Sequence, residues 1–462
     1  MDSTEAYQKC LERLTWATQN LNIEVQDSQL AEISELIVQP MTGPWRFFHI
    51  PQHIFDVGGN NDAIEVIAAL FHDLVYVQVD HSINLNVSYY VVPFTKEVKG
   101  QLVIREQNKL PKDFLFDMVA SIFDFVPGQL LNPFLGQNEF LSAVVAVKVL
   151  SSFLTLQHLF QIAACIESTI PFRPKSINGL SVGDRLYKRL QITNTTFKLG
   201  FNHEELQEIV KKGIRIANRD VSSFANPNPA YFLANTWNLL PETNHNLTVC
   251  NAYTILDYRL AMQKMEGFMS ILTPELIFRK YDNEPNEATY QLFLDVAKNN
   301  LEIAQLYLGT KLVTISFIEA LSFTLGLDIP LATIMGDLPT KGFSFIRLEN
   351  FLPIITQPHI STDKLENNVL FLLEKGRAKG GSNDLDNSPL AAFLAKSLGF
   401  EEIRRLIHIA KQFIQGNYTA DEFIANFYPD ITATIIDGIL ELFDSRKSSI
   451  KRFYQANKSA NG

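Results

Sequence analysis

The spacing of apolar residues along the chain predicts a protein built almost entirely from helices. Residues 3–19 and 27–38 have the pattern of two amphipathic helices. Leu11, Leu14 and Ala17 form the apolar stripe of the first one. The same spacing predicts helices over 111–127, 139–168, 202–224, 252–280 and 286–325, and helices that start near residues 349 and 389. We therefore expect an all-α fold.

Two short helices between residues 45 and 76 form the segment in which we expect the chemistry to lie. Pro51 can start the first helix, because the N–H that proline lacks has no partner at that position, and Gly58 can end it. Asp62 and Glu65 have the spacing of a capping box, which predicts that a second helix starts here and ends near residue 73. The segment should therefore form a helical hairpin.

This hairpin carries side chains that bind divalent metals. His53 lies on the first helix, and the doublet His72-Asp73 ends the second. A single His-Asp doublet means little. However, imidazole and carboxylate ligands from different helices are how helical proteins form sites for Zn, Mn or Fe. The structural alternative is two histidines that cap helices or fill the core.

The hairpin resembles the HD superfamily of metal-dependent phosphohydrolases. The matching residues are Arg46-Phe47-Phe48-His49 with His53, and Phe71-His72-Asp73 with Val75-Tyr76. They are most similar to an uncharacterised bacterial branch with R-x-[YF]-H-x3-H and F-H-D-x-[VI]-Y. The resemblance implies an HD-type helical core and His53, His72 and Asp73 as ligands of a Mn, Mg, Fe or Zn ion. It also implies a hydrolase in which metal-activated water cleaves a small phosphate ester or nucleotide.

The resemblance further implies a last ligand, an aspartate on a later helix. The apolar stripe of 202–224 ends in such a residue, because Ile209, Gly213, Ile216 and Asp220 follow one another at i, i+4, i+7 and i+11. We therefore assign Asp220 as the fourth ligand. Asp184 and Asp257 are rival candidates. In the structural alternative, Asp220 pairs with Arg215 or Arg219.

Four further residues are candidates for catalysis. Glu167 falls on a buried stripe, where a carboxylate should be paired, protonated or bound to a metal. Glu167 or Asp80 could orient the attacking water, while Arg46 and Arg173 could neutralise phosphoryl oxygens. A simple Glu167–Arg173 ion pair is the alternative. Asp80 lies in 77–94, which we expect to be a loop or a short hairpin.

Composition limits the partners and the setting. The chain has 462 residues, of which 46% are hydrophobic and 19% charged, enough for a sizeable core. A net charge of −10 argues against broad binding of duplex nucleic acid, but allows a local pocket for a small phosphorylated substrate. The cysteines are Cys10, Cys165 and Cys250; they form no disulfide framework and favour a reducing cytoplasm. No secretory signal is visible, and export by a signal-less route stays open.

A membrane span is not expected. The region 139–168 is apolar nearly all round, but Lys148, Gln157 and His158 would each be costly in lipid. A buried central helix fits this pattern better.

The polar segment 281–290 is the best candidate for a domain linker. We therefore expect an HD-type metal-binding domain over 1–275 and a helical C-terminal region over 285–462. Residues 225–250 should form an ordered loop region. The glycine-rich, charged stretch 375–388 should be a mobile tip.

Two other functions compete with hydrolysis. The first is a non-catalytic helical interaction protein, for example a secreted bacterial effector, that binds a protein partner through its C-terminal region. The second is an HD-type diiron oxygenase, which would need extra histidines such as His81, His158 and His203. Metal analysis distinguishes these functions. One ion per chain supports hydrolysis, two irons support oxygenation, and none supports the interaction protein.

Overall fold

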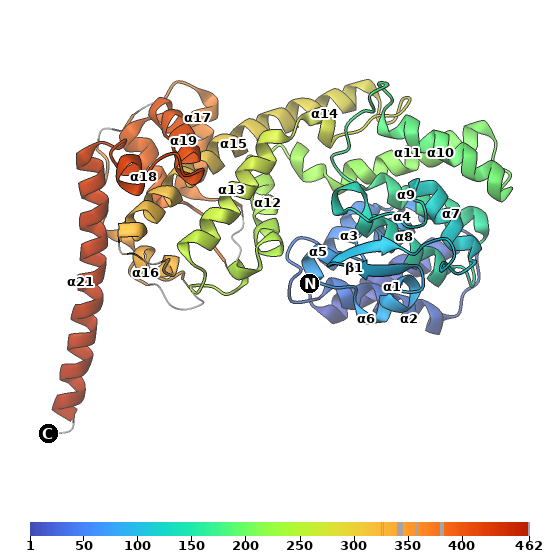
Figure 1. Cartoon of the computed structure of the whole chain (residues 1–462), viewed down its shortest axis with the longest axis horizontal. Coiled ribbons are helices and arrows are strands. Elements are labelled where there is room, and N and C mark those ends of the chain that lie inside the picture. The colour runs from blue at the N-terminus through green and yellow to red at the C-terminus, as the bar shows by residue number, and fades with distance from the viewer. Residues whose placement is uncertain are drawn as a thin grey trace. The chain divides into compact units, whose positions relative to one another are not determined.

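The computed structural model (Figure 1) describes residues 1–324, 326, 328–339, 345–356, 358–359, 361–378 and 383–460. Over these residues the chain is helical apart from loops and one small two-stranded sheet, which confirms the all-α prediction. The chain forms two compact units. One contains Met1–Ala225 and Leu272–Lys298, and the other contains Asn226–Ile271 and Asn299–Gly462.

The first unit contains most of the N-terminal helices. They are α1 (Ser3–Asn20), α2 (Asp27–Met41), α3 (Pro51–Gly58), α4 (Ala63–Phe71), α5 (Val77–Asp80), α6 (Leu85–Val91), α7 (Phe114–Phe123), α8 (Gln137–Leu150), α9 (Leu156–Ser168), α10 (Val182–Phe197), α11 (His203–Asp220) and α14 (Pro274–Ile277), with 3-10 turns at Pro133–Leu135 and Ser222–Ala225. The sheet pairs β1 (Thr95–Val98) antiparallel with β2 (Gln101–Ile104), so that Thr95 faces Ile104.

Helix α4 lies at the centre of this unit. Every one of its nine residues is buried, and it packs against α1, α3, α8, α9 and α11. A helix that is apolar all round is stable only when it is enclosed in this way. Helices α9 and α11 approach closely at Gly213, where an added Cβ would lie 2.1 Å from the Ser168 hydroxyl oxygen. The absence of a side chain at Gly213 therefore lets α11 lie against the core.

Several predicted elements of this unit match the structure and others do not. The helices predicted over 3–19 and 27–38 and the one starting at Pro51 are confirmed. The single helix predicted over 139–168 is wrong, because residues 151–155 separate α8 from α9 and the Thr155 hydroxyl caps α9. The region 77–94 forms the short helices α5 and α6 rather than a loop or hairpin.

The second unit contains the remaining helices. They are α12 (Pro229–Thr243), α13 (Ile255–Ile271), α16 (Leu331–Met335), α17 (Lys364–Lys375), α18 (Pro389–Leu398), α19 (Phe400–Ile414), α20 (Ala420–Ile424) and α21 (Pro429–Ala460), with 3-10 turns at His245–Thr248 and Leu348–Phe351. The long helix α15 (Glu287–Thr324) begins in the first unit and continues in the second. Helix α12 replaces most of the loop region predicted over 225–250.

The sequence predicted one domain boundary near residue 280, but the two units of the structure alternate along the chain. Residues 226–271 belong to the second unit, and the chain then returns to the first. The predicted linker is an ordered part of the first unit: Tyr281 is buried and stacks with Tyr187, and Glu284 pairs with Arg215 at 3.1 Å. A linker prediction from polar composition cannot detect such contacts. Part of the predicted mobile tip, 379–382, lies outside the described residues.

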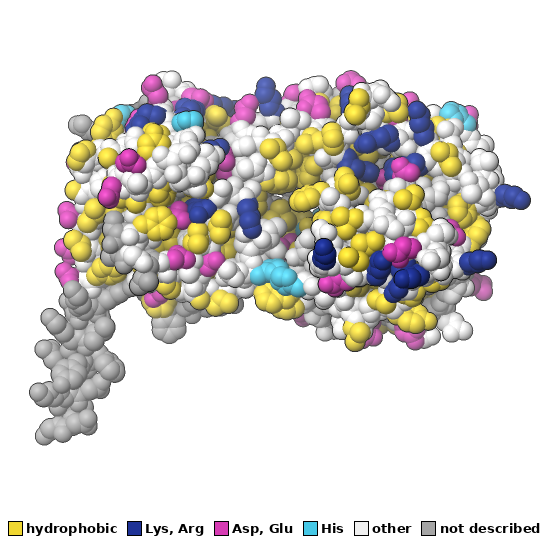
Figure 2. Space-filling view, viewed as in Figure 1, with side chains coloured by type: hydrophobic (Ala, Val, Ile, Leu, Met, Phe, Trp, Pro, Cys, Tyr) yellow, Lys and Arg dark blue, Asp and Glu magenta, His cyan; other side chains and the backbone are white. Residues whose placement is uncertain are grey.

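Among the described residues, one helical stretch is long and apolar enough to cross a membrane. It is Glu287–Phe323, with a mean hydropathy of 1.3, and 83% of its most apolar window is buried inside the protein. A core helix of a large helical protein has the same properties. On the face drawn in Figure 2, the acidic and basic side chains of the described residues are interspersed and do not form one continuous basic surface.

Candidate metal centre

The structure brings together the four residues predicted as metal ligands. His53 comes from α3, and Asp220 is the last residue of α11. His72 caps the C-terminus of α4 and Asp73 follows it. One nitrogen or oxygen atom from each of the four lies within 4.8 Å of the others. The neighbouring helices α3 and α4 and the distant helix α11 therefore place two imidazoles and two carboxylates at one point.

Each imidazole lies between the two carboxylates. His53 Nε2 lies 3.0 Å from Asp220 Oδ1 and 3.3 Å from Asp73 Oδ2. His72 Nε2 lies 2.9 Å from Asp73 Oδ2 and 3.7 Å from Asp220 Oδ1. Two ligands about 2.1 Å from one ion lie about 3.0 Å apart at a right angle and about 3.4 Å apart at the tetrahedral angle. The observed separations therefore suit a single divalent ion.

The hydrogen bonding of the histidines also suits a metal. His72 Nδ1 lies 2.8 Å from the Ala69 carbonyl oxygen, so this nitrogen donates its proton there and Nε2 faces the carboxylates. Metal-binding histidines are oriented by such bonds. The Nε2 atoms of His53 and His72 are buried and have no well-aligned hydrogen bond within the described parts of the chain. A divalent ion would satisfy both atoms.

Without an ion, protons neutralise the cluster. Burial alone would lower the pKa of His53, but the carboxylates of Asp220 and Asp73 raise it to about 9. The same groups raise the pKa of His72 well above its ordinary value. Despite burial, the histidines lower the pKa of Asp220 to about 2 and hold that of Asp73 well below its usual range. The two carboxylates are thus anionic and require a compensating positive charge.

The structural alternative for Asp220 is wrong. Arg215 Nε and Arg219 Nη2 instead donate to the buried carboxylate of Glu65, at 2.7 and 2.6 Å. These ion pairs join α11 to α4 and leave Asp220 to the histidines. They also occupy the Glu65 carboxylate, so Asp62 caps α4 alone, through the backbone N–H groups of residues 64 and 65.

The rival aspartates are used elsewhere. Asp184 forms a capping box with Ser181 at the start of α10. Asp257 accepts hydrogen bonds from Asn246 and from the Thr254 backbone, and belongs to the second unit. Neither is part of the four-residue cluster.

Arg46 and Asp80 differ from their predicted roles. The Arg46 side chain is fully buried and pairs with Asp80 through two bonds, Nε to Oδ1 at 2.9 Å and Nη2 to Oδ2 at 2.6 Å. Its third nitrogen donates to the backbone carbonyl of Asp73 at 3.0 Å. Arg46 is therefore engaged by Asp80 and by the backbone, and it holds the turn that carries Asp73.

Glu167 is likewise a paired carboxylate. Its buried side chain accepts from Arg173 and from Arg189, each at 2.5 Å. Burial opposes ionisation, but the two arginines lower the pKa of Glu167 to about 2. The water-positioning role predicted for Glu167 is therefore replaced by the ion-pair alternative. Arg173 Nε is buried and makes no hydrogen bond among the described residues, so Arg173 keeps one donor for a ligand.

Sequence patterns did not single out Glu139. This residue lies in the first turn of α8, and its Oε2 is buried without a hydrogen bond within the described chain. Burial, with a smaller contribution from the Asp73 charge, raises the pKa of Glu139 to about 7. The charges of Asp73 and His72 both act on this carboxyl. The only sequence signal was an acid at the start of a very apolar run.

The extra histidines considered for a second metal lie elsewhere. The His203 ring pairs with the Tyr187 hydroxyl, and His81 packs edge-on against Trp45. His158 lies in the first turn of α9. Among the described residues, the four-residue cluster is the one group of three or more ligand-type side chains that meets.

Comparisons with known proteins assign no family to this chain. No protein-family model, curated protein or solved structure matches it. The functional argument therefore depends on the site itself.

Proposed function

We propose that this protein is a metal-dependent hydrolase of a small phosphate ester or nucleotide, built on an HD-type helical core. The observation that carries the proposal is the meeting of two imidazoles and two anionic carboxylates from α3, α4 and α11. Both Nε2 atoms are buried and lack hydrogen bonds among the described residues. This is the donor set that binds Mn, Mg, Fe or Zn, and the open positions of such an ion bind water.

His53, His72, Asp73 and Asp220 would hold the ion, which when bound acidifies water and polarises a phosphoryl oxygen. The Ala69 carbonyl keeps His72 in the required tautomer, and Arg46 fixes the backbone at Asp73. We assign proton acceptance from the attacking water to Glu139 Oε2, a buried carboxylate oxygen in the first turn of α8 that has no hydrogen bond within the described chain. A divalent cation nearby would lower its pKa and keep it ready to accept a proton.

Substrate binding would use Arg173. Its Nε is buried without a hydrogen bond inside the described chain, although its other nitrogens pair with Glu167. A guanidinium held in this way can donate to a phosphoryl oxygen without first having to be ordered. Cys10 and Cys165 are buried free thiols, and we propose a reducing, cytoplasmic setting on this ground.

The test compares Asp73→Asn with wild type in ion binding and in hydrolysis of a phosphate-ester panel with Mn, Mg, Fe or Zn. Asn keeps the shape of Asp but not its charge, so ion affinity should fall and hydrolysis should drop by at least about 10². Asp117→Asn, an exposed position on α7, is the matched control and should behave as wild type.

Each result has a definite meaning. Full hydrolysis by the Asp73→Asn protein assigns the activity to another site. Two irons with a visible absorption band favour the oxygenase. A wild-type protein that binds no ion and hydrolyses nothing is instead the helical interaction protein.

A further inference from the structure

The second unit contains a pocket that the proposed hydrolysis does not use. The pocket lies between α15, α16 and the start of α18, and holds a cavity of about 80 Å³ that is partly open to solvent. Its walls are mainly apolar and include Tyr253, Ile315, Ile318, Leu331, Met335 and Leu390. A mainly apolar lining with a few polar groups is typical of sites for small organic molecules.

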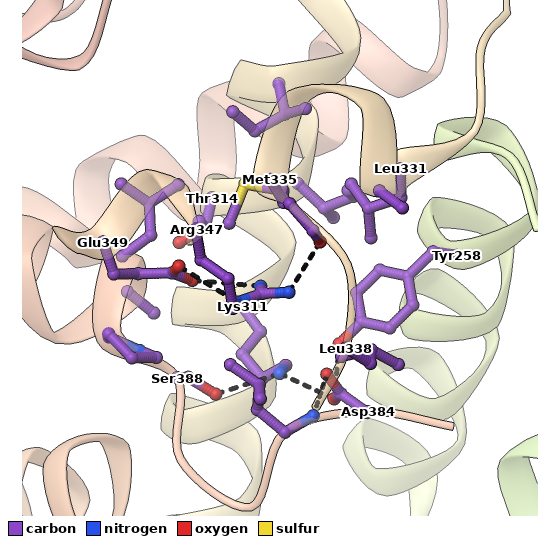
Figure 3. Close-up of a pocket in the computed structure, with 18 of the residues that line it drawn as sticks. Tyr258, Lys311, Thr314, Leu331, Met335, Leu338, Arg347, Glu349, Asp384 and Ser388 are labelled. Carbon is purple, nitrogen blue, oxygen red and sulfur yellow. Dashed lines mark hydrogen bonds and ion pairs between the residues drawn. The ribbon is translucent and has the colours of Figure 1, made fainter. Parts of the chain in front are cut away.

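A buried lysine gives one end of this pocket a fixed positive charge. Lys311, which is 7% exposed, donates to Asp384 Oδ2 at 3.0 Å and to Ser388 Oγ at 2.9 Å (Figure 3). Although burial opposes it, Lys311 and Arg377 lower the pKa of Asp384. Lys311 thus pairs with the Asp384 carboxylate at 3.0 Å. Its third N–H has no oxygen acceptor among the described residues, and the ammonium lies over the rings of Trp237 and Tyr258.

The start of α18 adds two backbone donors at the same end. Ser388 is the N-cap and Pro389 is the first residue of this ten-residue helix. Leu390 and Ala391 line the pocket and are 2% and 1% exposed. Their backbone N–H groups have no acceptor among the described residues. Buried amides are rarely left unpaired, and amides at a helix N-terminus bind anions. Lys311 Nζ donates to Ser388, the N-cap of the same helix, so these donors lie at the same end of the pocket.

The charges around the pocket limit what anion can bind. Arg347 pairs with Glu349 at 3.1 and 3.2 Å and donates to the Gly336 carbonyl at 2.7 Å. These residues line the pocket together with Lys311 and Asp384 (Figure 3). The two cations and two carboxylates sum to zero formal charge. Both carboxylates repel a dianion about twice as strongly as a monoanion, which favours a singly charged ligand.

We propose that this pocket binds a small monocarboxylic acid with an apolar body. Its carboxylate accepts from Lys311 Nζ and from the N–H groups of Leu390 and Ala391. Its apolar body lies along Ile315, Leu331 and the other apolar walls. The acid would be a second ligand of the protein, independent of the metal centre.

The test titrates the full chain with sodium octanoate, octanol and octyl phosphate by isothermal calorimetry. Octanoate should bind at one molecule per chain and at least about tenfold more tightly than octanol, because octanol lacks the charge that the buried donors recognise. It should also bind more tightly than octyl phosphate. Equal binding of octanol, or the absence of saturable octanoate binding, overturns the proposal. Tighter binding of octyl phosphate overturns the carboxylate assignment.

Variants distinguish this pocket from other surfaces. Ala332→Phe fills the pocket while keeping all the charged groups, and should abolish octanoate binding. The double substitution Lys311→Met with Asp384→Asn removes the ion pair as a unit and should weaken octanoate at least about tenfold, with octanol unchanged. Lys364→Met, at an exposed lysine on α17, is the control. If circular dichroism shows that the double variant is unfolded, octanoate binding by Ala332→Phe alone tests the proposal. Wild-type octanoate affinity in Ala332→Phe places the acid elsewhere.

Discussion

Replacement of Asp220 by Asn tests the proposed metal centre at the candidate ligand that is most distant in sequence. Asp220 is the residue through which α11 reaches the cluster, and its Oδ1 lies 3.0 Å from His53 Nε2. Asn has the same shape but carries no charge. We expect the ion affinity to fall roughly 10- to 100-fold or more, because the ion loses an anionic ligand.

This loss can be converted into a change in stability. At a free ion concentration of 100 times Kd, binding stabilises the folded wild-type protein by about 2.7 kcal/mol. At the same concentration, a tenfold weaker variant gains about 1.4 kcal/mol and a hundredfold weaker one about 0.4 kcal/mol. Thermal unfolding of both proteins with and without Mn or Zn measures this difference directly. Calorimetric titration gives the affinity independently.

The control is Asp184→Asn, which changes a rival aspartate that caps α10. It should lower stability to a similar extent with and without ion, and should leave the ion affinity unchanged. The reasoning fails if Asp220→Asn binds the ion as tightly as wild type. A stability loss that does not depend on added ion would make Asp220 a structural residue.

Three further predictions concern the groups around the centre. Glu65→Gln removes the buried carboxylate that pairs with Arg215 and Arg219. Because both arginines are partly exposed, we expect the free energy of unfolding in urea to fall by about 1–3 kcal/mol. The control Glu208→Gln, at an exposed partner of Arg215, should lower it by less than about 0.5 kcal/mol. The pKa of Glu167 is lowered to about 2 in the folded state, so its pairing stabilises the protein fully above about pH 4.5 and is lost as the pH falls toward 2. Acid titrations of stability should therefore be flatter over that interval in Glu167→Gln than in wild type, and equal slopes would contradict this. Glu139→Gln should lower hydrolysis about 10²- to 10⁴-fold with unchanged ion affinity, and an unchanged rate would remove Glu139 from the mechanism.

Local sequence signals were sufficient for the helices that form the centre. Pro51 and the Asp62 cap mark where α3 and α4 begin. The apolar stripe of α11 correctly predicted that Asp220 lies on the face of the helix that packs against the core. Such signals act within one or two helical turns. They therefore located three of the helices around the centre without any tertiary information.

Features that depend on tertiary contacts were not predictable. The apolar run over 139–168 conceals a break, because both α8 and α9 are buried and the turn between them is marked only by Ser151, Ser152 and the cap Thr155. Arg46 and Glu167 have the residue types of catalytic groups, and only their partners Asp80, Arg173 and Arg189 show that they are already paired. Composition likewise could not show that residues 226–271 fold with the second unit.

The distribution of arginines in the first unit explains why the cluster suits a cation. Three buried or half-buried acids near the centre have arginine partners: Glu65 pairs with two, Glu167 with two and Asp80 with one. Asp73 and Asp220 instead face histidines, which are neutral in their metal-binding form. Two buried carboxylates without a permanent cation are costly, and a single divalent ion compensates both charges at once. The surrounding ion pairs hold α4, α11 and the turn at Asp73 in place, and leave the two carboxylates to be compensated by protonated histidines or by an ion.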